Sequence, residues 1–203
     1  MAIELKLTKP GDSVKKLQLP LSKAGGIFNI EFFWDSKHDL DGHALLLSGG
    51  KLQGLGGVLS TYNPSLPLGD GSASSREPGD KRPFKTPDGA LLHHGDARTG
   101  GSADVDEMIT VNTGSVPANI DEIALIVTLH PAGVGNFREV KDAGFKIKDG
   151  DNRVLAEVNL SNDFGPYNVV QCGSLLRGDQ GWEYLVAGVG VKGDFNTVLD
   201  YFS

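Results

Sequence analysis

The feature of this sequence that most constrains its fold is the alternation of apolar and polar residues in short runs. These runs are rich in β-branched and aromatic residues, and Gly, Pro, Asn or Asp bounds each of them. Such a pattern is typical of short strands separated by turns. The expected strands lie at residues 3–7, 14–19, 27–34, 44–47, 58–62, 108–112, 123–129, 145–148, 154–160, 169–176 and 182–186. About ten short strands at this spacing predict a mainly β protein, a two-sheet β-sandwich.

Helix signals are few and short. Asp194 is a candidate N-cap for a last helix, and the apolar residues after it fall on one helical face: Phe195, Val198, Leu199 and Phe202. Residues 135–143 are long enough for one or two helical turns. The run 123–129 is apolar almost throughout, so we expect a central strand that is covered on both faces. The sequence therefore predicts a β-sandwich with a few short helices.

The chain length favours a single domain. A chain of 203 residues is most simply one domain with one core, and we expect it to span residues 1–203. Residues 64–90 differ from the rest, because five prolines lie there among Gly, Ser and charged residues, with Phe84 as the only aromatic residue. Such a segment buries little apolar surface. We expect a long Pro/Gly/Ser-rich loop excursion within the domain.

Charge and composition exclude several classes of function. The chain carries 19 Lys and Arg against 26 Asp and Glu, a net charge of −7, which argues against a nucleic-acid binder. We find no apolar run of the ~18 residues that a membrane span needs, and no apolar core of a signal peptide at the N-terminus. The single cysteine, Cys172, excludes an internal disulfide and a Cys-rich zinc site. We expect a cytoplasmic protein without direct membrane insertion.

Acidic residues concentrate in two separate stretches. Asp39 and Asp41 lie in one, and the glycine-rich segment 95–107 (GDARTGGSADVDE) carries four more carboxylates. Glycines let this segment fold sharply, and like charges ~4 Å apart repel by about 4 kcal/mol at an effective dielectric of ~20. A compact acidic loop therefore favours a bound cation, Ca²⁺ or less well Mg²⁺. From spacing alone, a solvated loop with each carboxylate facing water explains the pattern equally well.

Histidines offer a different metal chemistry. His93 and His94 precede Asp96, and imidazole with carboxylate suits zinc. Adjacent residues of a strand point to opposite faces, so the two rings are poorly placed to chelate one ion. We expect one histidine to orient the acidic loop and the other to be exposed. His130, at the end of the strand 123–129, is expected to be a hydrogen-bonding terminus.

Several blocks of the sequence, in order, resemble the tellurium-resistance (TerD) domain family. The segment GDARTGGSADVDEMITVN followed by VPANIDEIALIVTLH is similar to the signature of that family. Upstream, FFWDSKHDLDGHALLL and STYNP resemble further blocks of the family, as do NFREVKDAGFKIKD, NRVLAEVNLSNDF and GWEYLVAGVGVKG downstream. The resemblance covers almost the whole chain except residues 64–90. It implies a β-sandwich that binds Ca²⁺ through acidic loops and takes part in resistance to tellurite and other stresses.

The resemblance also implies a set of metal ligands. Matched position by position to the family's motifs, they are Asp39, Asp41, Asp96, Asp106 and Glu107, with Thr99 in a turn where a main-chain carbonyl can ligate, and Asp104 as a substitute ligand. Ala97, Ala103 and Val105 depart from the usual residues. If the family pattern holds two ions, we expect this chain to hold one well and the other weakly or not at all, because fewer anionic ligands weaken binding.

The function expected from this resemblance is non-enzymatic. A bound Ca²⁺ would cancel the repulsion, order the acidic loops and present a rigid surface to other proteins of a stress-response complex. Two alternatives stay open at this point. One is a hydrolase in which the carboxylates hold Mg²⁺ or Mn²⁺ and activate water. The other is a calcium-stabilised structural component, for example one encoded by a phage.

Overall fold

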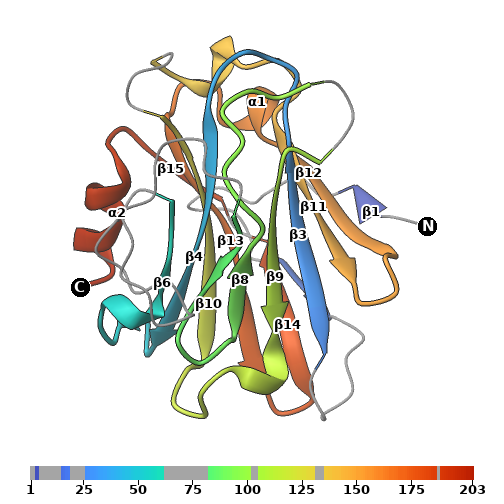
Figure 1. Cartoon of the computed structure of the whole chain (residues 1–203), viewed down its shortest axis with the longest axis vertical. Coiled ribbons are helices and arrows are strands. Elements are labelled where there is room, and N and C mark those ends of the chain that lie inside the picture. Colours follow the sequence, from blue (N-terminus) through green and yellow to red (C-terminus); the bar gives the residue numbers. More distant parts are fainter. Residues whose placement is uncertain are drawn as a thin grey trace.

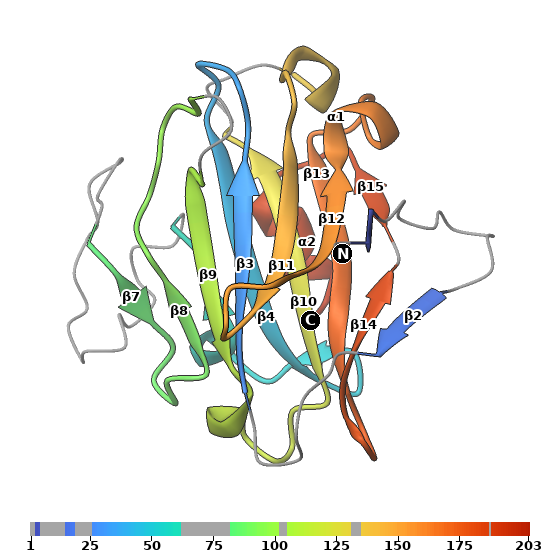
Figure 2. The ribbon, with the colours of Figure 1, turned by 90° about the vertical axis from the view of Figure 1, so that its right-hand side faces the viewer.

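Two mainly antiparallel sheets pack face to face in a computed structural model of the chain (Figures 1 and 2). The structure describes residues 26–61, 82–101, 105–130, 135–186 and 188–203, together with the backbone of two short strands, β1 (Ile3–Glu4) and β2 (Lys15–Gln18). The β-sandwich predicted from the alternating pattern is confirmed.

The first sheet has seven strands in the order β1-β12-β11-β3-β9-β8-β7. All of its pairings are antiparallel except that of β1 with β12. The strands beyond β1 are β3 (Ile27–Phe33), β7 (Phe84–Lys85), β8 (Leu91–His93), β9 (Glu107–Asn112), β11 (Gly144–Asp149) and β12 (Val154–Asn159).

The second sheet has eight strands, six of them in the order β2-β14-β13-β10-β4-β5, while β15 pairs with β13 and β6 with β4. The strands beyond β2 are β4 (Leu40–Ser48), β5 (Lys51–Leu52), β6 (Val58–Leu59), β10 (Glu122–Leu129), β13 (Val169–Gly178), β14 (Gly181–Val186) and β15 (Val189–Val191). Strands β4 and β10, far apart in sequence, pair along their length from Leu47–Glu122 to Leu40–Leu129.

The main core fills the space between the two sheets. Alternate residues of each strand face inward, as the period of two requires, for example Phe28, Ile30 and Phe32 of β3 opposite Leu125 of β10, all nearly inaccessible to solvent. Burial of these side chains is the main favourable term for the fold, at about 25 cal/mol per Å² of apolar surface.

The second sheet is covered on its outer face as well. Helix α2 (Phe195–Tyr201) begins after Asp194, whose side chain accepts a hydrogen bond from the main-chain N–H of Thr197 in a capping box, as the sequence indicated. Phe195, Val198 and Phe202 pack with Ile126 of β10 in a second apolar cluster. Strand β10 is therefore buried on both faces, which confirms the expectation from its continuous apolar run.

Some boundaries differ from those predicted. Strand β12 stops at Asn159 because the Asn159 side chain caps a short helix, α1 (Leu160–Asp163), and β6 ends at Leu59. The expected turns at 135–143 are one 3₁₀ turn, η3 (Phe137–Glu139); η1 (Leu55–Gly57) and η2 (Thr113–Ser115) are further 3₁₀ turns. Most of the excursion expected at 64–90 lies outside the described residues, while Phe84–Lys85 forms β7.

Candidate metal centre

The first acidic stretch lies where the chain enters β4. Leu40 faces the core between the sheets, so its neighbour Asp41 points to the outer face of the second sheet. Thr61 Oγ1 donates a hydrogen bond of 2.8 Å to Asp41 Oδ1, and the Asp39 carbonyl accepts one of 3.0 Å from the main-chain N–H of His130. Two contacts with distant segments thus fix this part of the chain.

The second acidic stretch lies between β8 and β9. Strand β8 ends at His93, and the chain then passes Asp96, Thr99 and Gly100 before β9 begins at Glu107. The main-chain N–H of Gly100 donates to the Ser36 carbonyl at 2.9 Å, which holds this segment against the residues that precede β4.

The fold brings three of the predicted ligands together. One carboxylate oxygen from each of Asp39, Asp41 and Asp96 lies within 4.8 Å of those of the other two. Asp41 is 2% and Asp96 8% exposed. Asp96 lies more than fifty positions after Asp39 and Asp41 in the sequence, yet the three residues share one partly buried site. Their negative charges repel one another.

Asp39 is the least satisfied member of this group. Its Oδ1 atom is buried, and no hydrogen-bond donor reaches it from the part of the chain that the structure describes. Burial raises the pKa of Asp39, and the nearby Asp96 carboxylate raises it further, against opposing effects of His130 and Arg98. A buried carboxylate oxygen without a donor favours a cation beside it, so the donor set fits a hard divalent ion.

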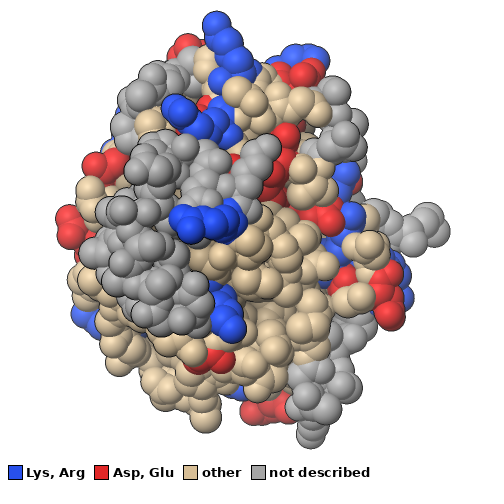
Figure 3. Space-filling model, viewed as in Figure 1, with Lys and Arg blue, Asp and Glu red and all other residues tan. Residues whose placement is uncertain are grey.

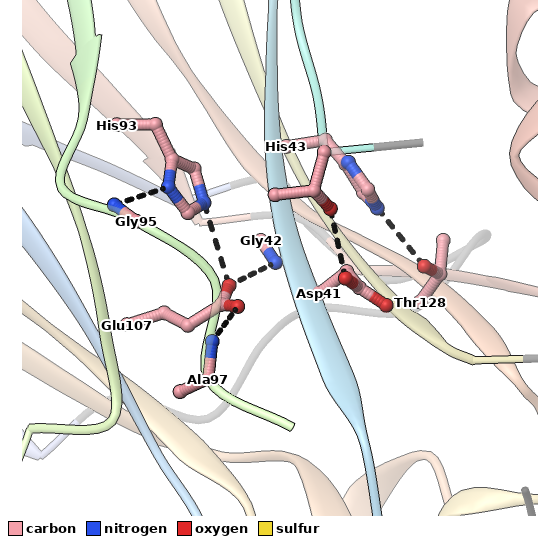
Figure 4. A network of polar contacts seen from close by, with 9 residues as sticks. Asp41, Gly42, His43, His93, Gly95, Ala97, Glu107 and Thr128 are labelled. Carbon is pink, nitrogen blue, oxygen red and sulfur yellow. Dashed lines mark hydrogen bonds and ion pairs between the residues drawn. The ribbon is translucent and has the colours of Figure 1, made fainter. Parts of the chain in front are cut away.

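Glu107 lies close enough to Asp39 and Asp96 for their charges to affect its pKa, but its own oxygens accept hydrogen bonds from the main chain (Figure 4). Its Oε2 accepts the main-chain N–H of Gly42 at 2.9 Å, and its Oε1 accepts that of Ala97 at 3.1 Å. Burial raises the pKa of Glu107 well above its ordinary value; the amides of Gly42 and Ala97 oppose this rise, and the carboxylates of Asp96 and Asp39 add to it. In this structure Glu107 binds the main chain.

Asp106 also binds the main chain. Its Oδ2 accepts the N–H of Trp34 at 2.9 Å, and its Oδ1 accepts that of Gly101 at 3.2 Å. Thr99 is exposed, and Asp104 lies outside the described residues. The structure thus groups Asp39, Asp41 and Asp96, and it gives Asp106 and Glu107 roles that the sequence analysis missed.

One signal in the sequence predicts that the Glu107 carboxylate is buried and accepts hydrogen bonds. Glu107, Ile109 and Val111 share one face of β9 by the period of two, and all three are buried. A glutamate in register with two core residues is expected to be buried with its carboxylate hydrogen-bonded.

The adjacent histidines point to opposite faces, as predicted. His93 is buried, stacks on Phe84 with ring centroids 4.7 Å apart, and accepts the N–H of Gly95 at its Nδ1. Its Nε2 lies 3.4 Å from Glu107 Oε2. His94 is exposed and bonds to Thr110 Oγ1 at 2.8 Å. Neither ring belongs to the group of three carboxylates, so the residues that converge offer oxygen ligands and no imidazole.

Comparisons with known proteins agree with this architecture. A crystal structure of a homologue of a telluride resistance protein from Streptomyces coelicolor A3(2) has a TM-score of 0.64 at 18% identity, over 88% of this chain and 96% of that chain. At this identity the likeness shows the fold alone.

None of the described helices is long and apolar enough to cross a membrane.

Similarities in sequence extend to curated proteins. General stress protein 16U of Bacillus subtilis is 34% identical over 52% of this chain and 56% of its own length, and the tellurium resistance protein TerD of an Alcaligenes species is 30% identical over 57% and 62%. The chain thus spans little more than half the length of these relatives. Stress response protein SCP2 of B. subtilis is 23% identical over 92% of this chain and 88% of its own length. The family model of the TerD domain matches residues 82–202, more than half of the sequence, and the chain therefore belongs to the TerD domain family.

Proposed function

We propose that this protein is a calcium-binding stress-response protein of the tellurium-resistance type. In this proposal Asp39, Asp41 and Asp96 hold a divalent cation that orders the loops around them. One observation carries the proposal, namely that three carboxylates from two distant stretches have oxygens within 4.8 Å of one another. The buried Oδ1 of Asp39, to which the described residues donate no hydrogen bond, supports it.

The chemistry of the donors favours Ca²⁺. All three side chains offer hard oxygen atoms and a combined charge of about −3 when ionised, which suits Ca²⁺ and, less well, Mg²⁺. A Ca²⁺ ion takes six to eight oxygen ligands, so water and main-chain carbonyls would complete its shell. A bound ion would offset the mutual repulsion of the carboxylates and would stabilise the folded state by an amount that grows with the logarithm of its concentration once the site is saturated.

The role that we assign to the ion is structural rather than catalytic. It would fix the loop between β8 and β9 against the entry to β4 and so present an ordered surface to other proteins of a cytoplasmic stress response. Acidic and basic side chains are interspersed over the described part of the face in Figure 3. A mixed surface of this kind suits protein partners better than nucleic acid, whose phosphates favour a basic face.

Calorimetric titration with calcium, combined with thermal unfolding, tests the proposal. We expect heat of binding and a melting temperature that rises with calcium; at 100 times the dissociation constant the ion adds about 2.7 kcal/mol to the free energy of unfolding. Asp96→Asn should abolish or strongly weaken both effects. Asp151→Asn is the matched control, because Asp151 is exposed in the turn between β11 and β12 and loses the same charge. No heat and an unchanged melting curve for the unmodified protein would overturn the proposal.

A further inference from the structure

We infer that Glu107 is a positioning residue of the metal centre, which sets the separation of Asp41 and Asp96 without binding the ion itself. The inference rests on the proposed function and adds a residue that controls the geometry of the proposed calcium site. It follows from the two main-chain groups that the Glu107 carboxylate holds.

Each of these groups lies directly after a candidate ligand. Gly42 follows Asp41 in β4, and Ala97 follows Asp96 in the segment between β8 and β9. Their N–H groups donate to different oxygens of the same carboxylate, at 2.9 Å and 3.1 Å. Because β4 belongs to the second sheet and Glu107 begins β9 in the first, this carboxylate connects the two ligand-bearing segments across the sandwich (Figure 4).

The surroundings of Glu107 keep its carboxylate in place. The residue is 2% exposed, and His93 Nε2 lies 3.4 Å from its Oε2. His93 is itself fixed by the Gly95 amide and by stacking on Phe84. A buried carboxylate with both oxygens accepting main-chain bonds loses those bonds if it moves to coordinate an ion, at a cost in free energy for each amide left unsatisfied.

Asp106 secures the far end of the same segment. Its carboxylate accepts the N–H of Gly101 and that of Trp34, at the end of β3. Glu107 and Asp106 therefore hold the segment that carries Asp96 at two points. Glu107 holds it against β4 of the second sheet, and Asp106 holds it against the end of β3 in the first sheet. The geometry needs a carboxylate at position 107, because a glutamine offers one acceptor oxygen and would place its NH₂ group against the second amide.

Terbium luminescence separates a positioning residue from a ligand. Tb³⁺ prefers oxygen donors, and its lifetimes in H₂O and D₂O count the water molecules on the bound ion. We expect Glu107→Gln to weaken Tb³⁺ binding by about 10- to 100-fold, as is typical for groups that orient metal ligands, and to leave the water count of the saturated site unchanged. Asp96→Asn should weaken binding and add water to the ion. Asp151→Asn should change neither quantity.

The outcomes distinguish the two proposals. A water count that rises in Glu107→Gln would make Glu107 a ligand, and an unchanged affinity would remove its positioning role; both overturn the inference alone. No Tb³⁺ binding by the unmodified protein would overturn the proposed function and, with it, the inference.

A second measurement needs no variant and guards against misfolding of Glu107→Gln. In the unmodified protein we expect the amide hydrogens of Gly42 and Ala97 to exchange slowly with solvent both without and with calcium, because Glu107 holds them in both states. If adding calcium sped up their exchange, Glu107 would have left the amides for the ion, and the inference would fail.

Discussion

Gly42 lies directly against the ring of Phe32, so close that a Cβ atom at this position would stand 2.5 Å from Phe32 Cε2. The contact joins the two sheets beside the candidate metal centre, because Gly42 belongs to β4 and Phe32 to β3. The same glycine donates its N–H to Glu107. A residue without a side chain therefore allows the main chain of β4 to approach both the core and the buried carboxylate.

This contact predicts that Gly42→Ala destabilises the protein. The added methyl group must displace a buried ring, and overpacking of this kind costs about 1–3 kcal/mol. Urea unfolding measures the change in the free energy of unfolding. Gly56→Ala is the matched control, because a Cβ there meets nothing within 4 Å. Equal stabilities of the two variants would show that the sheets can separate at Gly42 without cost.

A neighbouring pair of glycines gives a second prediction. A Cβ on Gly100 would lie 2.3 Å from Trp34 Cδ1 and from the Trp34 carbonyl oxygen, whereas one on Gly101 meets nothing within 4 Å. We expect Gly100→Ala to push the segment that carries Asp96 away from β3, and so to weaken calcium binding about tenfold or more, as misplacement of a metal ligand typically does. Gly101→Ala should bind like the unmodified protein. Calcium titration of both variants measures this, and indistinguishable affinities would contradict the close approach to Trp34.

A third prediction concerns Arg98, a cation that lies beside the acidic group. Arg98 Nε lies 3.8 Å from Asp39 Oδ2, and the Arg98 side chain is 59% exposed. Because the Arg98 side chain is exposed, the pair contributes little to stability, but the positive charge of Arg98 opposes a bound cation. We expect Arg98→Gln to raise calcium affinity about two- to fivefold at low salt, with a smaller gain at high salt because ions screen exposed charges. Lys51→Gln removes the same charge near Ser48, at the end of β4 away from Asp41, and should leave the affinity unchanged. A fall in affinity for Arg98→Gln would contradict the prediction.

Much of the fold was predictable because the signals for strands and caps are local. The alternation in β3 and the cap at Asp194 each depend on a few neighbouring residues, so the sequence alone located them. The short strands β7 and β8 were missed, since tertiary pairing rather than local propensity creates them: β8 pairs with β9, and β7 pairs with β8.

The convergence of the three carboxylates at the candidate metal centre was predictable only in part. The acids of the two stretches were expected to meet, but this came from the resemblance to a family, because the pairing of β4 with β10 and the packing of the sheets are long-range. The resemblance also placed Asp106 and Glu107 among the ligands, because a match to a motif does not show which main-chain amides a carboxylate faces. The alternation along β9, which places Glu107 on the same inward face as Ile109, indicates that the Glu107 carboxylate is buried.

The raised pKa of Asp39 predicts how proton and metal compete. Because burial and the Asp96 carboxylate raise this pKa in the folded state, the calcium-free fold holds the proton more tightly than the unfolded chain does. The resulting contribution to stability is fully present below the ordinary Asp value of about 4 and is lost as the pH rises through the higher pKa of the folded state. Near neutral pH the ionised carboxylates repel, and calcium should restore the stability that is lost.

We therefore expect the calcium-free protein to lose stability from this group as the pH rises from about 4, and we expect calcium affinity to fall as the pH drops through the folded-state pKa of Asp39. Chemical unfolding at a series of pH values, with and without calcium, measures both effects. Asp39→Asn is the control, since it keeps the shape of the side chain but cannot ionise; it should reduce the pH dependence of the calcium-free stability and weaken calcium binding. If Asp39→Asn and the unmodified protein had the same calcium-free profile, Asp39 would titrate at its ordinary pKa, and the repulsion that a bound ion is proposed to relieve would be absent.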